Sequence, residues 1–180
     1  MSVAAVARQY AHAMADVAVA NNEVDKVERE LSALAAIIRN RDELLELLAS
    51  PVVSQDNKRR VLQSLIDQAG PSGTTVNLLN VLLRNYRLQY LPEIYDEFKR
   101  VMNERRGIVV ASVTTASAIS PDQQAALTRK LERVTGKRVE FDFDSDPSLI
   151  GGVVTRIGSV VYDGSIKTQL EQIKRRMKQS

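Results

Sequence analysis

Apolar residues recur every three or four positions through the first hundred or so residues, which is the period of an amphipathic α-helix. The first stripe consists of Val3, Val6, Ala7, Tyr10, Met14 and Val17, and His12 points to the opposite, solvent side. Further stripes predict helices over residues 24–38, 44–48, 61–66, 74–85 and 92–101. Polar or proline-containing joints separate these helices. We therefore expect a six-helix bundle over residues 1–105.

The pattern changes after Arg105-Arg106-Gly107, where the β-branched residues 108–113 predict a strand. A helix opening at Ser120-Pro121, a strand over residues 139–143, a hairpin and a last helix are expected to follow. We expect a small α+β domain of order βαββα over residues 106–180. The predicted fold class is therefore mainly α, with a helical bundle followed by this α+β domain.

The segment from Asp146 to Ser165 predicts a two-stranded ribbon that leads directly into a helix. Its strands flank Gly158-Ser159, a pair typical of a tight turn, and Asp163-Gly164-Ser165 ends the second strand. Ser165 is expected to cap a helix whose apolar stripe is Ile166, Leu170, Ile173 and Met177. Gly151, Gly152 and Gly158 are expected to permit close packing of the backbone in the ribbon.

The composition of the 180 residues, with 44% hydrophobic and 26% charged residues, is typical of a globular protein. No apolar run approaches the roughly 20 residues that cross a bilayer, so we expect no direct membrane insertion. The N-terminal residues lack the layout of a secretory signal, and the chain contains no cysteine. These features indicate a protein that stays in the cytoplasm.

The sequence offers little of the chemistry that catalysis or metal binding requires. A serine triad or a zinc site needs several imidazoles, thiolates or convergent carboxylates, whereas this chain has one histidine, His12, and no cysteine. The alternation Asp142, Asp144, Asp146 resembles the start of a calcium loop, but Pro147 and Val153 occupy its glycine and glutamate positions. The simpler interpretation is a strand with Phe141 and Phe143 inward. We expect no catalytic residue, cofactor or metal, although sequence alone leaves a carboxylate pair, and hence an enzyme, open.

The basic character of the chain, with a pI near 9.3, raises the alternative of a nucleic-acid-binding or ribosome-associated protein. The excess of basic residues lies in residues 106–180, which carry 12 Lys and Arg against 8 Asp and Glu. Aromatic residues make up only 4% of the chain, and Tyr86, Tyr90, Tyr95 and Phe98 cluster in the helical half instead of alternating with the basic residues. Base stacking therefore has no obvious platform, and binding of nucleic acid is not the favoured interpretation.

The predicted helix over residues 74–85 is apolar on nearly all sides. Leu79 and Leu83 belong to one face, whereas Leu78 and Val81 project from the other. Such a helix is either central in its bundle or covered by a partner. The first helix also has small residues on its back, namely Ala4, Ala5, Ala11 and Ala15. Two such helices side by side could form a groove for an amphipathic helix.

Several fragments, in order, resemble the delta subunit of bacterial F-type ATP synthase, the counterpart of the mitochondrial oligomycin-sensitivity-conferring protein. They are Ala7-Arg8 with Tyr10-Ala11, Leu47-Leu48 with Ser50-Pro51 and Lys58, the segment from Asn77 to Phe98, Leu149-Ile150-Gly151-Gly152, Arg156-Ile157-Gly158 and Asp163-Gly164-Ser165. The resemblance covers essentially the whole chain. Tyr86 occupies a place where this family often has a smaller residue.

The resemblance implies a stator protein rather than a catalyst, located at the cytoplasmic side of the inner membrane through its complex. Its helical domain would hold the N-terminal helix of an alpha subunit against the first and fifth helices. That contact maps to Tyr10, Ala13, Met14, Val17, Leu78, Val81, Leu82 and Asn85. The C-terminal domain would bind the b subunits of the peripheral stalk through the exposed side of its ribbon and through Ile166, Leu170, Ile173 and Met177.

Overall fold

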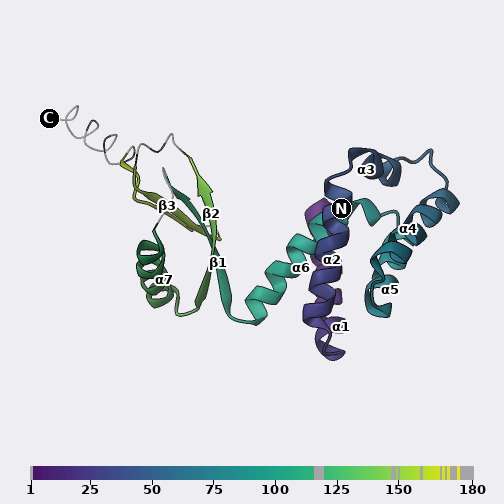
Figure 1. Ribbon diagram of the computed structural model, residues 1–180, viewed down its shortest axis with the longest axis horizontal. Coiled ribbons are helices and arrows are strands. Elements are labelled where there is room, and N and C mark those ends of the chain that lie inside the picture. Colours follow the sequence, from purple (N-terminus) through teal and green to yellow (C-terminus); the bar gives the residue numbers. More distant parts are fainter. Residues whose placement is uncertain are drawn as a thin grey trace. The chain divides into compact units, whose positions relative to one another are not determined.

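The computed structural model shows a mainly helical chain that divides into two compact units, Met1–Met102 and Asn103–Ser180 (Figure 1). It describes residues 2–115, 120–146, 149, 151–158, 160–166, 168, 170 and 174. The sequence pattern placed the boundary slightly later, at residues 105 and 106, where the last helix of the first unit ends.

The first unit contains the helices α1 (Val3–Ala20), α2 (Val24–Arg39), α3 (Asp42–Ala49), α4 (Gln55–Ala69), α5 (Gly73–Arg84) and α6 (Leu91–Arg105), with a short 3-10 helix η1 (Leu88–Tyr90) before α6. Each falls on a stripe that the sequence predicts. Ser2, Ser54 and Ser72 cap the N-termini of α1, α4 and α5 by accepting backbone hydrogen bonds. The starts of these helices are therefore fixed by local sequence.

One buried cluster joins all six of these helices. Phe98 of α6 is fully buried among leucines, isoleucines and valines from the other helices, and Leu91, Ile94 and Val101 extend the same apolar face. Ion pairs at the surface support this packing: Arg8 of α1 reaches Glu97 of α6 at 3.3 Å. His12 is exposed, as its position on the helix predicts.

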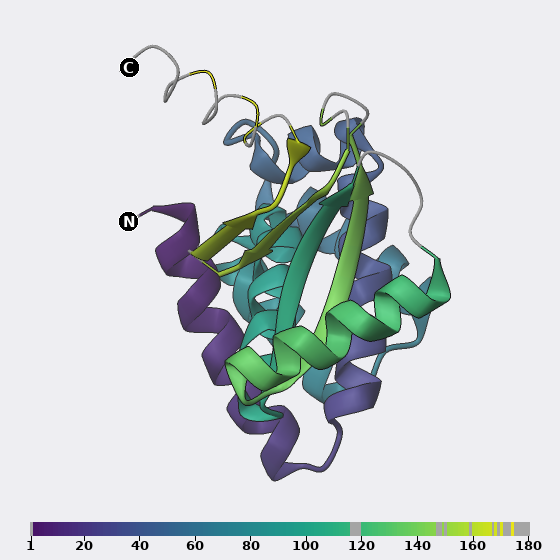
Figure 2. The same ribbon diagram turned by 90° about the vertical axis from the view of Figure 1, so that its left-hand side faces the viewer.

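The second unit is a four-stranded sheet with one helix on a face (Figure 2). Its elements are β1 (Ile108–Thr115), α7 (Pro121–Thr135), β2 (Arg138–Ser145), β3 (Val153–Ile157) and β4 (Val160–Asp163), and the strand order is β2-β1-β3-β4. β1 and β2 are parallel and joined through α7, whereas β1 with β3 and β3 with β4 are antiparallel. Residues 166, 168, 170 and 174 are helical.

Two expectations for this unit need correction. Three strands follow α7, so the expected order βαββα counts one strand too few: the strand over residues 139–143 is separate from both strands of the hairpin. Phe143, expected to point inward, is 42% exposed, because the small core gathers Leu127 and Leu131 of α7 on Ala111, Val139 and Phe141 and does not include it.

Candidate partner-binding site

Helices α1 and α5 are tied together at both ends of their contact. The side-chain amide of Asn21 donates to the hydroxyl of Thr74 at 3.3 Å. At the other end, the guanidinium of Arg87 donates to the hydroxyl of Tyr10 at 3.3 Å and lies 5.6 Å from the centre of its ring. Since the end of α1 meets the start of α5, the two helices run antiparallel.

Exposed apolar side chains lie along this pair of helices. Val3 and Val17 of α1 are 39% and 45% exposed, and with Tyr10 they recur every seven residues. On α5, Val81 is 39% exposed and the exposed Asn85 follows one turn later. A seven-residue spacing places side chains on one stripe of a helix, as in the contact seam of a coiled coil. We call the surface formed by Tyr10, Ala13, Val17, Val81 and Asn85 the α1/α5 seam.

The remaining residues predicted for this contact lie beneath the seam. Met14 is 4% exposed, Leu78 is 9% exposed and Leu82 is fully buried, so these side chains form the floor and not the rim. Leu78 and Val81 share the second apolar face of α5, but Leu78 is buried within the chain whereas Val81 is exposed. Ala11 and Ala15 are likewise fully buried in the core instead of forming a smooth back.

A carboxylate holds the start of α5 in place. Glu30 of α2 accepts hydrogen bonds from the Ser72 amide at 3.0 Å, the Ser72 hydroxyl at 2.7 Å and the Thr75 hydroxyl at 2.6 Å. Burial raises the pKa of Glu30, but the hydrogen bonds from Thr75 and Ser72, with the charge of Lys26, lower it to below its usual range. A carboxylate at a helix N-terminus is also favoured by the helix dipole.

A buried lysine stabilises the C-terminal end of α3, as Glu30 stabilises the N-terminal end of α5. Lys58 of α4 is only 4% exposed, and its ammonium donates to the carbonyl oxygen of Leu48 at 2.7 Å. This carbonyl belongs to the last turn of α3, where helical partners are missing and positive charge is favourable. Periodicity does not predict the roles of Glu30 and Lys58, because each side chain forms its hydrogen bonds with another helix or its cap.

The C-terminal unit carries its own exposed apolar side chains. Val160, Val161 and Tyr162 of the edge strand β4 are 47% to 50% exposed, and Ile166 and Leu170 are 42% and 54% exposed. Ile173 and Met177, also predicted for a partner contact, lie outside the described residues. An exposed edge strand with apolar side chains is a surface that proteins normally cover.

The glycine motif brings the start of β3 against the turn that follows β4. The Gly164 amide donates to the Val153 carbonyl at 2.9 Å, and the Ile166 amide donates to the Gly151 carbonyl at 3.0 Å. Gly152 has φ +87°, and a Cβ there would lie 2.8 Å from the Cα of Ser165. Gly158 has φ +57° at the end of β3. A close approach of backbone segments therefore explains Gly152 alone among the three glycines expected to permit it. A Cβ at Gly151 would meet the side chain of Ile166, and a Cβ at Gly158 would have no atom within 4 Å, so the expectation of close backbone packing is wrong for these two glycines.

The Asp163-Gly164-Ser165 turn is closed by side chains of the helix start. Asp163 accepts from the Ser165 amide at 2.9 Å and from the Thr168 hydroxyl at 2.7 Å. The hydrogen bond from the Ser165 backbone, followed by those from Thr168 and Ser165, lowers the pKa of Asp163. Ser165 in turn accepts from the Thr168 amide at 3.2 Å, as an N-cap residue does.

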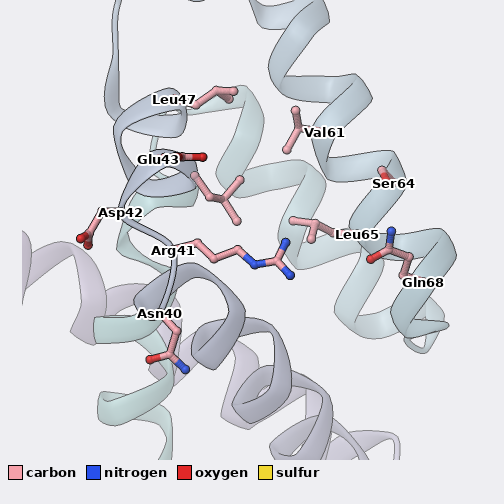
Figure 3. A pocket seen from close by; sticks show the side chains of 10 residues that line it. Asn40, Arg41, Asp42, Glu43, Leu47, Val61, Ser64, Leu65 and Gln68 are labelled. Atoms are coloured by element: carbon pink, nitrogen blue, oxygen red, sulfur yellow. The ribbon is translucent and has the colours of Figure 1, made fainter.

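An open hollow of about 640 Å³ lies between the α2–α3 junction and α4 (Figure 3). Leu44, Leu47, Val61 and Leu65 form its apolar walls, and the side chain of Arg41 extends into it. Its two carboxylates, Asp42 and Glu43, belong to the first turn of α3, where negative charge stabilises the helix. The position of these two carboxylates is thus explained by the stability of α3, without a ligand in the hollow.

The described residues contain no group of three or more metal-ligating side chains. Within the same residues, no helix is both long and apolar enough to cross a bilayer. What the geometry offers is a pair of exposed apolar surfaces, one in each unit.

Residues 6–177 match the family described as the ATP synthase delta (OSCP) subunit. The chain belongs to this family. It is 43% identical over 173 residues to the ATP synthase subunit delta of Desulforamulus reducens, covering 96% of this chain and 95% of that one. It is 38% identical to the ATP synthase subunit delta of Myxococcus xanthus, covering 97% of each chain.

The fold also matches a chain in a cryo-EM structure of the Toxoplasma gondii mitochondrial ATP synthase hexamer, with a TM-score of 0.72 and 24% identity. That match covers 95% of this chain and 96% of the other. As a member of the delta family, the chain is a stator subunit of an F-type ATP synthase, part of a hetero-oligomeric complex. The comparisons give no support to the nucleic-acid-binding alternative.

Proposed function

We propose that the first unit acts as a six-helix bundle that holds an amphipathic N-terminal helix of the alpha subunit in the α1/α5 seam. The observation that supports this proposal is the seam itself. Two helices fixed at both ends leave Val17 and Val81 about two-fifths exposed above a buried floor. A partner helix with a matching apolar stripe would cover these side chains.

The second unit, in this proposal, binds the b subunits of the peripheral stalk through β4 and the helix that begins at Ile166. The exposed side chains of Val160, Tyr162 and Leu170 support it. The stalk would also stabilise this unit, since its core is small and a domain of this size is marginally stable by itself. The chain would thus associate peripherally with the membrane through its complex, on the cytoplasmic side.

The proposed role is mechanical and not catalytic. While the rotor turns, the chain would transmit the reaction torque from the catalytic head to the stalk, so both contacts must dissociate slowly. A nanomolar contact corresponds to about 12 kcal/mol of binding free energy. An apolar helix-in-groove interface of standard size can supply this. Rigid helix packing, as around Phe98, suits a part that bears load.

Calorimetric titration of the full chain with a peptide covering the N-terminal helix of its own organism's alpha subunit tests the first contact. The parent should bind stoichiometrically, and Val81→Asp should weaken binding at least about 100-fold, because a buried, unpaired carboxylate replaces an apolar contact. The free energy of unfolding of Val81→Asp in urea should differ little from that of the parent, since Val81 is 39% exposed in the free chain.

Val19→Asp is the matched control. Val19 is 46% exposed, but it lies two residues from Val17 and therefore about 200° around α1. This variant should bind the peptide as the parent does. If Val81→Asp also binds as tightly as the parent, the seam is not the docking site; if the parent shows no binding, the alpha helix is not the partner of this unit.

A further inference from the structure

Tyr86 has a backbone conformation that its side chain disfavours. Its φ is +56°, in the left-handed region, where a Cβ clashes with the backbone at a cost of about 1–2 kcal/mol. The conformation is required by the end of α5. The Arg87 amide donates to the Leu82 carbonyl at 2.8 Å, and the Tyr86 amide donates to the Leu83 carbonyl at 3.1 Å. This is the Schellman pattern of helix termination, in which glycine is the usual residue.

The chain uses suitable residues at its other helix ends of this kind. Gly70 after α4, Gly107 after α6 and Gly136 after α7 have φ between 57° and 67°, and Asn22 follows α1 with φ 55°. Glycine has no Cβ, and asparagine tolerates this region by forming local hydrogen bonds. Among the described residues, Tyr86 is thus the one aromatic residue at such a position.

The side chain of Tyr86 does not offset this strain within the fold. It is 63% exposed, more than any other aromatic residue in the described part of the chain. Its hydroxyl forms no hydrogen bond and its ring no aromatic or cation–π contact with described residues. Tyr86 also lies outside the hydrophobic cluster that Tyr10, Tyr90 and Tyr95 contact. A strained residue whose side chain has no stabilising contact within the fold suggests a role in binding a partner.

Tyr86 lies at one end of the α1/α5 seam. It directly follows Asn85 of the seam and precedes Arg87, whose guanidinium covers the ring of Tyr10. Arg84 is exposed and forms no ion pair with the described residues. The turn therefore places a tyrosine between two arginines along the chain, directly after the last residue of the seam on α5.

We infer that Tyr86 is an anchor residue for the helix that occupies the α1/α5 seam, contacting an apolar side chain at the end of that helix beside an acidic one. This inference rests on the proposed function. Large aromatic side chains dominate the binding energy of many interfaces. The two flanking arginines favour a partner helix that carries negative charge at this end. In this inference, the backbone strain at Tyr86 lowers the stability of the free chain, and the exposed ring stabilises the complex.

The test uses the opposite effects that Tyr86 is expected to have on the stability of the fold and on the binding of the partner helix. Tyr86→Gly and Tyr86→Asn should leave the urea midpoint of the full chain unchanged or raise it, because both residues accept a positive φ. The same variants should bind the alpha N-terminal peptide at least about 10-fold more weakly in calorimetry. Tyr86→Phe, which keeps the ring, should bind within about twofold of the parent.

The outcomes separate this inference from the proposed function. If Tyr86→Gly and Tyr86→Asn bind as the parent does while Val81→Asp does not, Tyr86 is no anchor, but the seam remains the docking site. A clear fall in the urea midpoint of Tyr86→Gly would show that the ring stabilises the fold, and would also overturn the inference. If the parent itself fails to bind the peptide, both proposals fall.

Discussion

Replacing Glu30 by glutamine should destabilise the first unit by about 2 kcal/mol at pH 7. Three hydrogen bonds from Ser72 and Thr75 converge on the Glu30 carboxylate. A hydrogen bond to a charged group contributes about 1.5–3 kcal/mol, against about 1 kcal/mol for a neutral one. Glutamine keeps the shape and can retain neutral hydrogen bonds, but it loses the charge and its interaction with the α5 dipole, worth about 0.3–1 kcal/mol. We take a low total because Glu30 is only partly buried.

The effect should disappear at low pH. The folded pKa of Glu30 lies below its usual value, so its charge stabilises the fold above the unfolded pKa of about 4.3. That stabilisation is lost as the pH falls through the lower, folded pKa. Parent and Glu30→Gln should therefore differ at pH 7 and converge in acid.

Urea unfolding of the full chain, followed by far-UV circular dichroism at both pH values, measures this difference. Glu46→Gln is the matched control, because it removes the same charge from an exposed position of α3. It should unfold within about 0.5 kcal/mol of the parent. The reasoning is refuted if Glu30→Gln matches this control at pH 7, or if its deficit persists unchanged in acid.

Lys58→Met should destabilise the first unit by about 1–3 kcal/mol in urea unfolding, because the Leu48 carbonyl loses its charged donor in a buried site. An equal or higher stability would mean that the cost of burying the ammonium outweighs the hydrogen bond. Gly152→Ala should destabilise the second unit by more than about 2 kcal/mol, since its Cβ would meet the backbone of Gly164 and Ser165 at a positive φ. Hydrogen exchange of the β3 and β4 amides should detect this loss, whereas unchanged protection would show that the turn can open without cost.

The local pattern of the sequence determined where the helices and strands lie. A 3.6-residue apolar period marks the helices α1 to α6. In the second unit, the capping residues Ser120 and Gly136 mark the two ends of α7. Runs of β-branched residues on either side of Gly158 mark the hairpin. These features depend on residues a few positions apart, so the chain reveals them without its tertiary contacts.

Which sides of these elements are covered was decided by the tertiary structure. The period of α5 shows that Leu78 and Val81 lie on a second apolar face, but only the packing of the helices decides that Leu78 is buried and Val81 exposed. The hydrogen bonds of Glu30 and the contact of Arg87 with Tyr10 join residues 42 to 77 positions apart. Periodicity fixes which residues share a face, whereas the choice of the face that meets another helix depends on how distant segments pack.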